Sequence, residues 1–277
     1  LDDVPDEMVY GISEAGRDEV SASWILSGTG RSNEPPVATI EGSPTSTQTG
    51  ELLELSGQAS VDPEGDPLRY EWSFISIPRS STLELFESAS DLLYLMPDVA
   101  GRYEIGLTVY DSAGAQDTAS VEFEVGAGEA LQVDLIWDPS LGDVDLHLVP
   151  EGQDMFSIES CSFQTPFQDV DQDGVPDSTA PIHTGDDEGE RGIERIMIGR
   201  DALESGRFNV MVNAFELVGP VEVNLVVSAQ GGNDELSNSV TLLSENCETW
   251  GGGLLDVGSR TFVAGVGEHQ LICAEGL

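Results

Sequence analysis

The sequence contains no lysine, and all ten of its basic residues are arginines. With 52 acidic residues, the formal net charge at pH 7 is −42. A surface of this charge repels nucleic acid and anionic lipid, which excludes ordinary binding to a phosphate backbone. The absence of lysine also excludes a Walker-type phosphate site, a Schiff base and a lysine–asparagine crosslink. The charge instead favours divalent cations and a saline or calcium-rich exterior.

Cysteine is scarce, with Cys161, Cys247 and Cys273 in no paired zinc-type spacing. The odd count permits one disulfide and one thiol, and we expect Cys247 and Cys273 to pair because both lie in the last segment. No apolar run is long enough to cross a membrane, and residues 1–30 lack the pattern of a signal peptide. We therefore expect no membrane insertion by this chain, and we expect Leu1 to be the start of a processed or excerpted chain.

The apolar residues that are present alternate with polar ones. Tyr103, Ile105, Leu107 and Val109 fall on one face of a predicted strand, and the same period of two recurs in several later stretches, at 121–125, 131–137, 144–148, 208–212 and 221–227. Turn signals separate these short strands, and no segment has convincing helical periodicity; 201–204 is expected to form one turn. The pattern predicts an all-β fold of tandem immunoglobulin-like or jelly-roll-like β-sandwiches.

Proline and glycine mark the expected domain boundaries. Residues 1–34 carry one predicted strand, Ser21–Leu26, and end at a stiff Pro-Pro link. The predicted sandwiches are residues 35–126 and 129–277, separated by a short glycine-containing joint. The orphan strand is expected to pair outside the first sandwich, with a neighbouring domain or subunit; the alternative is that residues 1–34 lie on this chain's own surface.

Two stretches of the first predicted sandwich carry a family resemblance. Ser60–Phe74 (SVDPEGDPLRYEWSF) and Pro97–Asp111 (PDVAGRYEIGLTVYD) resemble the signature of polycystic-kidney-disease (PKD) modules. The resemblance implies an immunoglobulin-like sandwich that serves as a spacer or adhesive unit on cell surfaces and in secreted enzymes, with Trp72 in its core. Leu26–Gly30 resembles the last strand of hydin-like immunoglobulin-type modules. The Gly-Asp-Gly that usually follows the tryptophan strand is replaced here by Ile75–Pro78.

The second predicted sandwich resembles an uncharacterised β-sandwich domain that accompanies PKD modules in secreted proteins of myxobacteria and related bacteria. The resemblance rests on Trp137-Asp138, Gly142–Leu148, Cys161, Asp186-Asp187, Gly192, Glu194, Ile196 and Gly206–Val210. It implies no established activity.

The spacing of acids after residue 168 is that of a calcium loop. Asp169, Asp171 and Asp173 precede Gly174, and the Val175 carbonyl and Asp177 complete the predicted ligands. The twelfth position, where such loops usually place a bidentate acid, is alanine, so further oxygens are expected from Asp186, Asp187 or Glu188. The alternative is a solvated acidic loop. Some PKD modules bind calcium near the Asp-Pro loop, which makes Asp62, Glu64 and Asp66 secondary candidates, although a solvated turn is favoured there.

A second all-oxygen site is predicted around the strand that contains Asp143 and Asp145. Their period of two places both carboxylates on one strand face, and Asp187 and Glu194 are expected to join them from a loop. A glycosidase dyad is the alternative for such a pair, but no aromatic platform accompanies it. The three histidines show no zinc-type pair, and no nucleophile elbow or phosphate loop is present.

These observations predict a non-catalytic extracellular or cell-surface protein with a structural or adhesive role, stabilised by Ca²⁺. The expected partners are other surface-protein subunits or domains, with polysaccharide as a further candidate. The alternative is a calcium-dependent carbohydrate-binding accessory module of a secreted enzyme. A sugar bound beside Asp143 and Glu194, near an exposed aromatic, would favour the alternative, whereas extensive subunit contacts would favour the structural role.

Overall fold

A computed structural model describes residues 32–85, 88–157, 159–168, 175–187, 191–203, 206–230, 234–265 and 269–271. Its regular structure is almost entirely β-strand, with two 3₁₀ turns, Pro139–Leu141 and Arg200–Ala202. The predicted all-β class is therefore confirmed, and the second 3₁₀ turn overlaps the single turn expected at 201–204. The predicted strand Ser21–Leu26 lies outside the described residues.

The first sandwich is built from β1 (Ser46–Gln48), β2 (Leu53–Ser56), β3 (Arg69–Ser76), β4 (Leu92–Leu95), β5 (Gly101–Tyr110) and β6 (Gln116–Gly126). One sheet has the order β1-β6-β5-β3, and the other consists of β2 and β4. β1 pairs with β6 in parallel, whereas the remaining pairs are antiparallel.

The core of the first sandwich follows from the alternation along β5. Tyr103, Ile105, Leu107 and Val109 are all buried there, as predicted. Trp72 of β3 is buried in the same core, and its indole N–H donates a hydrogen bond to the Ser90 carbonyl at 2.9 Å. A buried indole thus keeps its single donor satisfied.

The second sandwich contains β7 (Ala130–Ile136), β8 (Gly142–Pro150), β9 (Ile182–His183), β10 (Ile193–Ile198), β11 (Arg207–Leu217), β12 (Val221–Gln230), β13 (Asp234–Leu243), β14 (Glu248–Asp256), β15 (Thr261–Ala264) and β16 (His269–Leu271). One sheet has the order β13-β12-β7-β10-β9, and the other β15-β14-β11-β8, with β16 also paired to β14. Antiparallel pairing holds both sheets together.

Strand β8 is buried on both faces. Val144, Leu146 and Leu148 point into the core of the second sandwich, as their alternation predicts. Asp145 and His147 alternate with them and are also buried, at 3% and 0% exposure. Because Asp145 and His147 are buried, other parts of the chain must cover the face of β8 on which they lie. The long connection after β8 covers part of it: the ring of Phe156 packs edge-on against the His147 ring, with 5.5 Å between the ring centroids.

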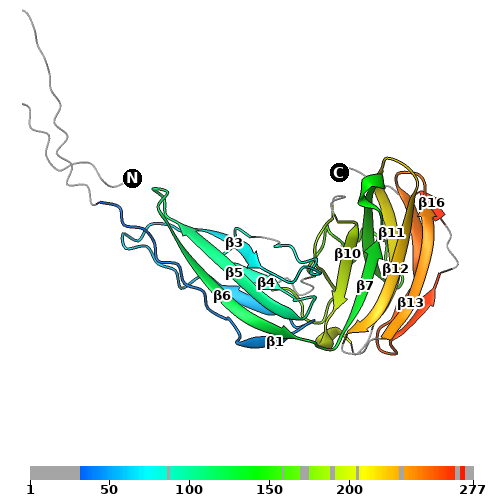
Figure 1. The fold of residues 1–277 in the computed structure, drawn as a ribbon, viewed down its shortest axis with the longest axis horizontal. Coiled ribbons are helices and arrows are strands. Elements are labelled where there is room, and N and C mark those ends of the chain that lie inside the picture. Colours follow the sequence, from blue (N-terminus) through cyan, green and yellow to red (C-terminus); the bar gives the residue numbers. More distant parts are fainter. Residues whose placement is uncertain are drawn as a thin grey trace, which may run out of the picture.

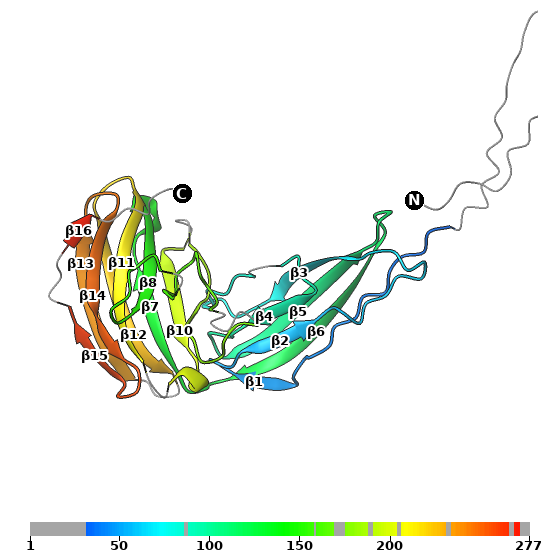
Figure 2. The same ribbon diagram turned by 180° about the vertical axis from the view of Figure 1, so that it is seen from behind.

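The two sandwiches meet at an angle, so the molecule is bent at their junction (Figure 1). β7 and β10 lie on the side of the second sandwich nearer the first, while β13 and β15 lie at its far side (Figure 2). A small apolar cluster fills the junction, formed by Met96, Ala130, Ile182 and Met197. Among the described residues, no helix is long and apolar enough to cross a membrane.

The described cysteines are one disulfide-bonded residue and one free thiol. Cys247 is disulfide-bonded, and Cys161 is a buried free thiol. The expected partner, Cys273, lies outside the described residues.

Candidate metal centre

Three carboxylates converge at the edge of the second sandwich. Asp145 comes from β8, Glu194 from β10, and Asp186 from the segment that joins β9 to β10. One oxygen from each lies within 4.8 Å of an oxygen of both others. Asp145 and Glu194 are buried, and Asp186 is half-buried. The sequence predicts Asp145 and Glu194 in one site, and the structure brings their carboxylates together.

Glu194 is the most deeply buried of the three acids. It is 0% exposed, and its Oε2 accepts a hydrogen bond from the Leu146 N–H at 2.6 Å. The other oxygen, Oε1, has no hydrogen-bond partner among the described residues. A buried carboxylate oxygen without a partner is costly, and a bound cation removes that cost. This orphan oxygen is what distinguishes the cluster from an ordinary acidic surface.

Electrostatics at the cluster disfavour three simultaneous negative charges. Burial, together with Glu194, Asp143 and Asp186, raises the pKa of Asp145 well above its ordinary value. Burial also raises the pKa of Glu194 well above its ordinary value, and backbone hydrogen bonds from Leu146 and Asp187 offset only part of the shift. A divalent ion would reverse this balance by favouring the charged forms.

His183 lies beside the cluster on β9. Its Nε2 is 3.3 Å from Glu194 Oε2, and the ring is fully buried. Burial lowers the pKa of His183 to about 4, so the ring is neutral at pH 7. A neutral imidazole can donate one hydrogen bond to Glu194 and orient it, but it cannot neutralise its charge.

The donor set suits a hard divalent cation. Ca²⁺ takes six to eight oxygen ligands, and Asp145, Asp186 and Glu194 would supply three of them. Asp143 is half-buried two residues away from Asp145, and its charge acts on both Asp145 and Glu194. A bound divalent ion would neutralise the charge of these carboxylates.

The structure differs from the sequence analysis at Asp187. Its carboxylate accepts hydrogen bonds from the backbone N–H groups of Arg191, at 2.9 Å, and Ile193, at 3.0 Å. Asp187 therefore organises its own loop, and its neighbour Asp186 supplies the carboxylate that joins the cluster. The sequence cannot show which of these two adjacent aspartates joins the cluster, because in a loop the period of a strand does not apply and a turn can direct either side chain inward.

Most of the predicted calcium loop lies outside the described residues, namely Asp169, Asp171 and Asp173, as does Glu188. Val175 and Asp177 are described; the Val175 side chain is 39% exposed, and the Asp177 N–H donates to the Gln168 carbonyl at 2.7 Å. The loop remains a prediction.

The Asp-Pro loop of the first sandwich is an ordered turn. Asp62 Oδ1 accepts hydrogen bonds from the N–H groups of Glu64, at 2.9 Å, and Asp66, at 3.0 Å. Asp66 in turn accepts a 2.5 Å hydrogen bond from Ser112 Oγ. Such local bonds are typical of aspartate in turns, and calcium binding at this loop stays a secondary prediction.

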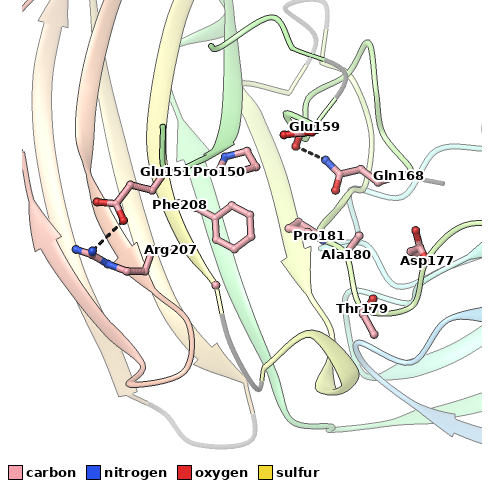
Figure 3. A pocket seen from close by; sticks show the side chains of 11 residues that line it. Pro150, Glu151, Glu159, Gln168, Asp177, Thr179, Ala180, Pro181, Arg207 and Phe208 are labelled. Carbon is pink, nitrogen blue, oxygen red and sulfur yellow. Dashed lines mark hydrogen bonds and ion pairs between the residues drawn. The ribbon is translucent and has the colours of Figure 1, made fainter. Parts of the chain in front are cut away.

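A pocket of about 690 Å³ lies beside the first residues of β11 (Figure 3). Arg207 and Glu151 form a half-exposed ion pair at 2.8 Å on one side, and Gln168 and Asp177 lie on the other. The half-buried ring of Phe208 lies between them and faces the Pro150–Pro181 side in Figure 3. The pocket is separate from the carboxylate cluster, since it shares none of its residues.

Comparison with known families identifies the first sandwich. Residues 42–125 match the family model described as "K319L-like, PKD domain". A PKD domain is present there. The match covers the stretches that resembled PKD modules in the sequence, and it does not extend to the second sandwich.

Solved structures with similar folds include PKD domains. The PKD1 domain of Vibrio anguillarum Epp is 25% identical, with 34% of this chain and 98% of that domain covered and a TM-score of 0.27. The PKD domain of human KIAA0319 is 22% identical, with 38% and 92% covered and a TM-score of 0.29. A nucleoside hydrolase-related hypothetical protein from Saccharophagus degradans is 24% identical over 34% of this chain, with a TM-score of 0.28. Only 26% of that last protein is covered, and no curated protein matches this chain.

Sequence reasoning missed the role of Asp186 in the cluster and the position of His183. The β9–β10 pairing places His183 opposite Ile196, which brings the imidazole to Glu194. One available signal was the charged pair Glu194-Arg195 inside an otherwise apolar strand, since charges there require partners.

Proposed function

We propose that this chain is a non-catalytic structural or adhesive module of an extracellular or cell-surface protein, and that Ca²⁺ stabilises it. The observation that carries the proposal is the buried cluster of Asp145, Asp186 and Glu194, with an orphan Glu194 oxygen. The PKD match over residues 42–125 supports a surface or accessory role. The net charge of −42 supports an environment in which divalent cations and salt are plentiful.

The proposed calcium sites are two. One uses Asp145, Asp186 and Glu194, with Asp143 nearby, and the other is the predicted loop from Asp169 to Asp177. Binding to the folded state alone raises the free energy of unfolding by about 2.7 kcal/mol at a hundredfold excess over Kd. For sandwiches of this size, that corresponds to a rise in Tm of roughly 5–10 °C.

Calorimetry and thermal melting test the proposal. Titration of the chelator-treated chain with Ca²⁺ should show two sites, and excess chelator should lower the Tm. Asp145→Asn should abolish one site, whereas the matched control Glu124→Gln, on the exposed face of β6, should retain both. An unchanged melting curve in chelator, with no heat of calcium binding, would contradict the proposal.

The adhesive part of the proposal rests on exposed strand edges. β13 is the outermost strand of its sheet, and it exposes Val240 and Leu242, each at 56%. Unpaired backbone groups and apolar side chains at an edge accept a strand from another domain or subunit. Other surface-protein subunits or domains are therefore the proposed partners.

A second candidate function is calcium-dependent carbohydrate binding as an accessory module of a secreted enzyme. The pocket at Phe208 favours it, because an aromatic ring flanked by Arg207, Glu151 and Gln168 offers both stacking and hydrogen bonds. Glycan-array binding that is lost in Phe208→Ala and retained in Phe215→Ala, an exposed aromatic elsewhere on β11, would support this function. Absence of binding to any glycan would leave the structural role alone.

A further inference from the structure

The loop that carries Asp186 touches both sandwiches. We define the bridging segment as residues 182–187 and 191–195, which belong to the second sandwich. It contributes Asp186 and Glu194 to the carboxylate cluster. It also makes the principal polar contacts with residues 81–84 of the first sandwich, which belong to the PKD domain.

The contacts with the first sandwich are direct and short. The Glu84 N–H donates to the Thr184 carbonyl at 2.7 Å, and the Thr82 and Thr184 hydroxyls lie 2.5 Å apart in a buried position. The Asp186 N–H donates to Glu84 Oε2 at 3.2 Å. A Cβ placed on Gly185 would lie 2.3 Å from the Thr82 carbonyl oxygen, so the two backbones are in close contact there. The backbone of Asp186 and the two residues before it, Thr184 and Gly185, are therefore part of the domain interface.

The three acids differ in how firmly the fold holds them. Asp145 lies on β8, which pairs with β11, and Glu194 lies on β10, which pairs with β7 and β9. Asp186 lies on a connection without strand pairing. Because Asp145 and Glu194 are fixed by paired strands, any rearrangement of the cluster that follows loss of a cation falls on Asp186 and its connection. Its movement displaces the backbone that docks on Thr82 and Glu84.

We propose that a divalent cation held by Asp145, Asp186 and Glu194 clamps the two sandwiches at a fixed angle. The inference rests on the proposed calcium binding and adds to it a mechanical role for one of the sites. The fully buried Glu194 side chain, whose Oε1 lacks a partner among the described residues, is the independent sign that a ligand belongs there. Removal of the ion loosens the bridging segment and broadens the range of interdomain angles.

Other contacts limit the size of the effect. Arg195 bonds Asp98 of the first sandwich and Asp134 of the second, and the apolar junction around Met96 and Met197 remains buried. The sandwiches therefore stay in contact without the ion, and what changes is the width of the angular distribution. Because coupling between sites is reciprocal, weakening the docked interface also weakens cation binding.

Distance measurements between spin labels test the clamp in the full chain. Labels on Ala113→Cys and Val218→Cys report the angle, since both sites are exposed and lie on different sandwiches, and the native free thiol Cys161 is fully buried. We expect one narrow distance distribution in excess Ca²⁺ and a broad one in excess chelator. In Asp145→Asn, which removes a charged ligand on β8 of the second sandwich, the distance distribution should remain broad in Ca²⁺.

A matched interface variant separates the clamp from calcium binding itself. Thr82→Val removes the hydroxyl contacts with Thr184 and with Asp98, the latter at 3.1 Å, and leaves every ligand in place. It should bind Ca²⁺ with about fivefold lower affinity and show a broader distribution than the unsubstituted chain. If calorimetry shows Ca²⁺ at the cluster while the distance distribution is identical with and without it, the clamp is wrong and the proposed function stands. If calorimetry shows no calcium binding, both are wrong.

Discussion

Arg195 links the two sandwiches through buried ion pairs. Its Nε and one terminal nitrogen bond both oxygens of Asp134, at 2.7 and 3.0 Å, and its other terminal nitrogen bonds Asp98 at 2.8 Å. Asp98 also accepts hydrogen bonds from Ser81 and Thr82. The planar guanidinium suits this geometry, because it can satisfy two carboxylates from one position.

Replacing Arg195 with methionine should strongly destabilise the protein. The substitution keeps much of the buried volume and leaves the Asp98 and Asp134 carboxylates without their cation, which costs about 3–5 kcal/mol. Urea unfolding measures the loss. The control is Arg102→Met, whose exposed pair with Glu122 should be worth less than about 1 kcal/mol. If both substitutions lowered the free energy of unfolding equally, burial of the Arg195 network would contribute nothing to stability.

The adjacent aspartates 186 and 187 should differ in what they do. Asp186→Asn should remove one calcium site, because the cluster loses a charged ligand. Asp187→Asn should keep both sites and lower stability by about 1–2 kcal/mol, because it weakens the charge-assisted hydrogen bonds to Arg191 and Ile193. Calorimetric stoichiometry and chemical unfolding measure the two effects. If Asp187→Asn removed a calcium site and Asp186→Asn did not, Asp187 would be the ligand, as the sequence predicted.

At the scale of the elements, β8 illustrates how an edge strand is protected. β11 pairs with one edge of β8. At the other edge, the Glu194 carboxylate accepts a hydrogen bond from the Leu146 N–H, and Leu148 forms a β-bridge with Cys161. An unpaired edge of this length invites association with another strand. Here a side chain and part of the long connection cover it, which also buries Cys161 and raises the pKa of its thiol well above the ordinary range.

Gly185 should be intolerant of a side chain. A Cβ at this position would lie 2.3 Å from a backbone oxygen of the first sandwich, so Gly185→Ala should separate the bridging segment from residues 82–84. Overpacking of this kind costs about 1–3 kcal/mol. The control is Gly219→Ala, where the added carbon meets open space. Thermal melting of both variants decides the point, and equal Tm values would contradict the close docking.

At the scale of the whole molecule, net charge opposes association between copies of the chain, whereas an exposed strand edge favours it. The net charge of −42 makes copies of the chain repel one another at low ionic strength, and salt or divalent ions reduce that repulsion. β13 is the outermost strand of its sheet and exposes the apolar side chains of Val240 and Leu242. Association should therefore depend on salt and calcium.

Deleting residues 1–30 should lower the mass measured by light scattering in calcium-containing saline. The reason is that the predicted strand Ser21–Leu26 is expected to pair with a neighbouring domain or subunit and not with the first sandwich. Full and truncated chains are compared at the same protein concentration, with chelator as the control condition. If both chains are monomeric and equally stable, the strand has no role in assembly.

Much of the fold was predictable because the alternation of apolar and polar residues is itself typical of a β-strand. β5 and β12 read clearly as strands, and Trp72 reads as a core residue. The sequence analysis did not identify β13 or β14, because DELSNSVTLL and ETWGGGLLD lack a clean period of two. Their strand state comes from pairing with distant neighbours.

The sequence by itself determined the all-β class and the acidic character, since these follow from local period and composition. It also named Asp145 and Glu194 as candidate ligands, but it expected Glu194 on a loop, whereas the structure places it on β10. Only the tertiary structure decided that Asp186 and not Asp187 completes the cluster. It also placed His183 beside Glu194 and put Arg195 between the two sandwiches. These choices depend on loop conformation and strand register between segments far apart in the chain, which no local pattern encodes.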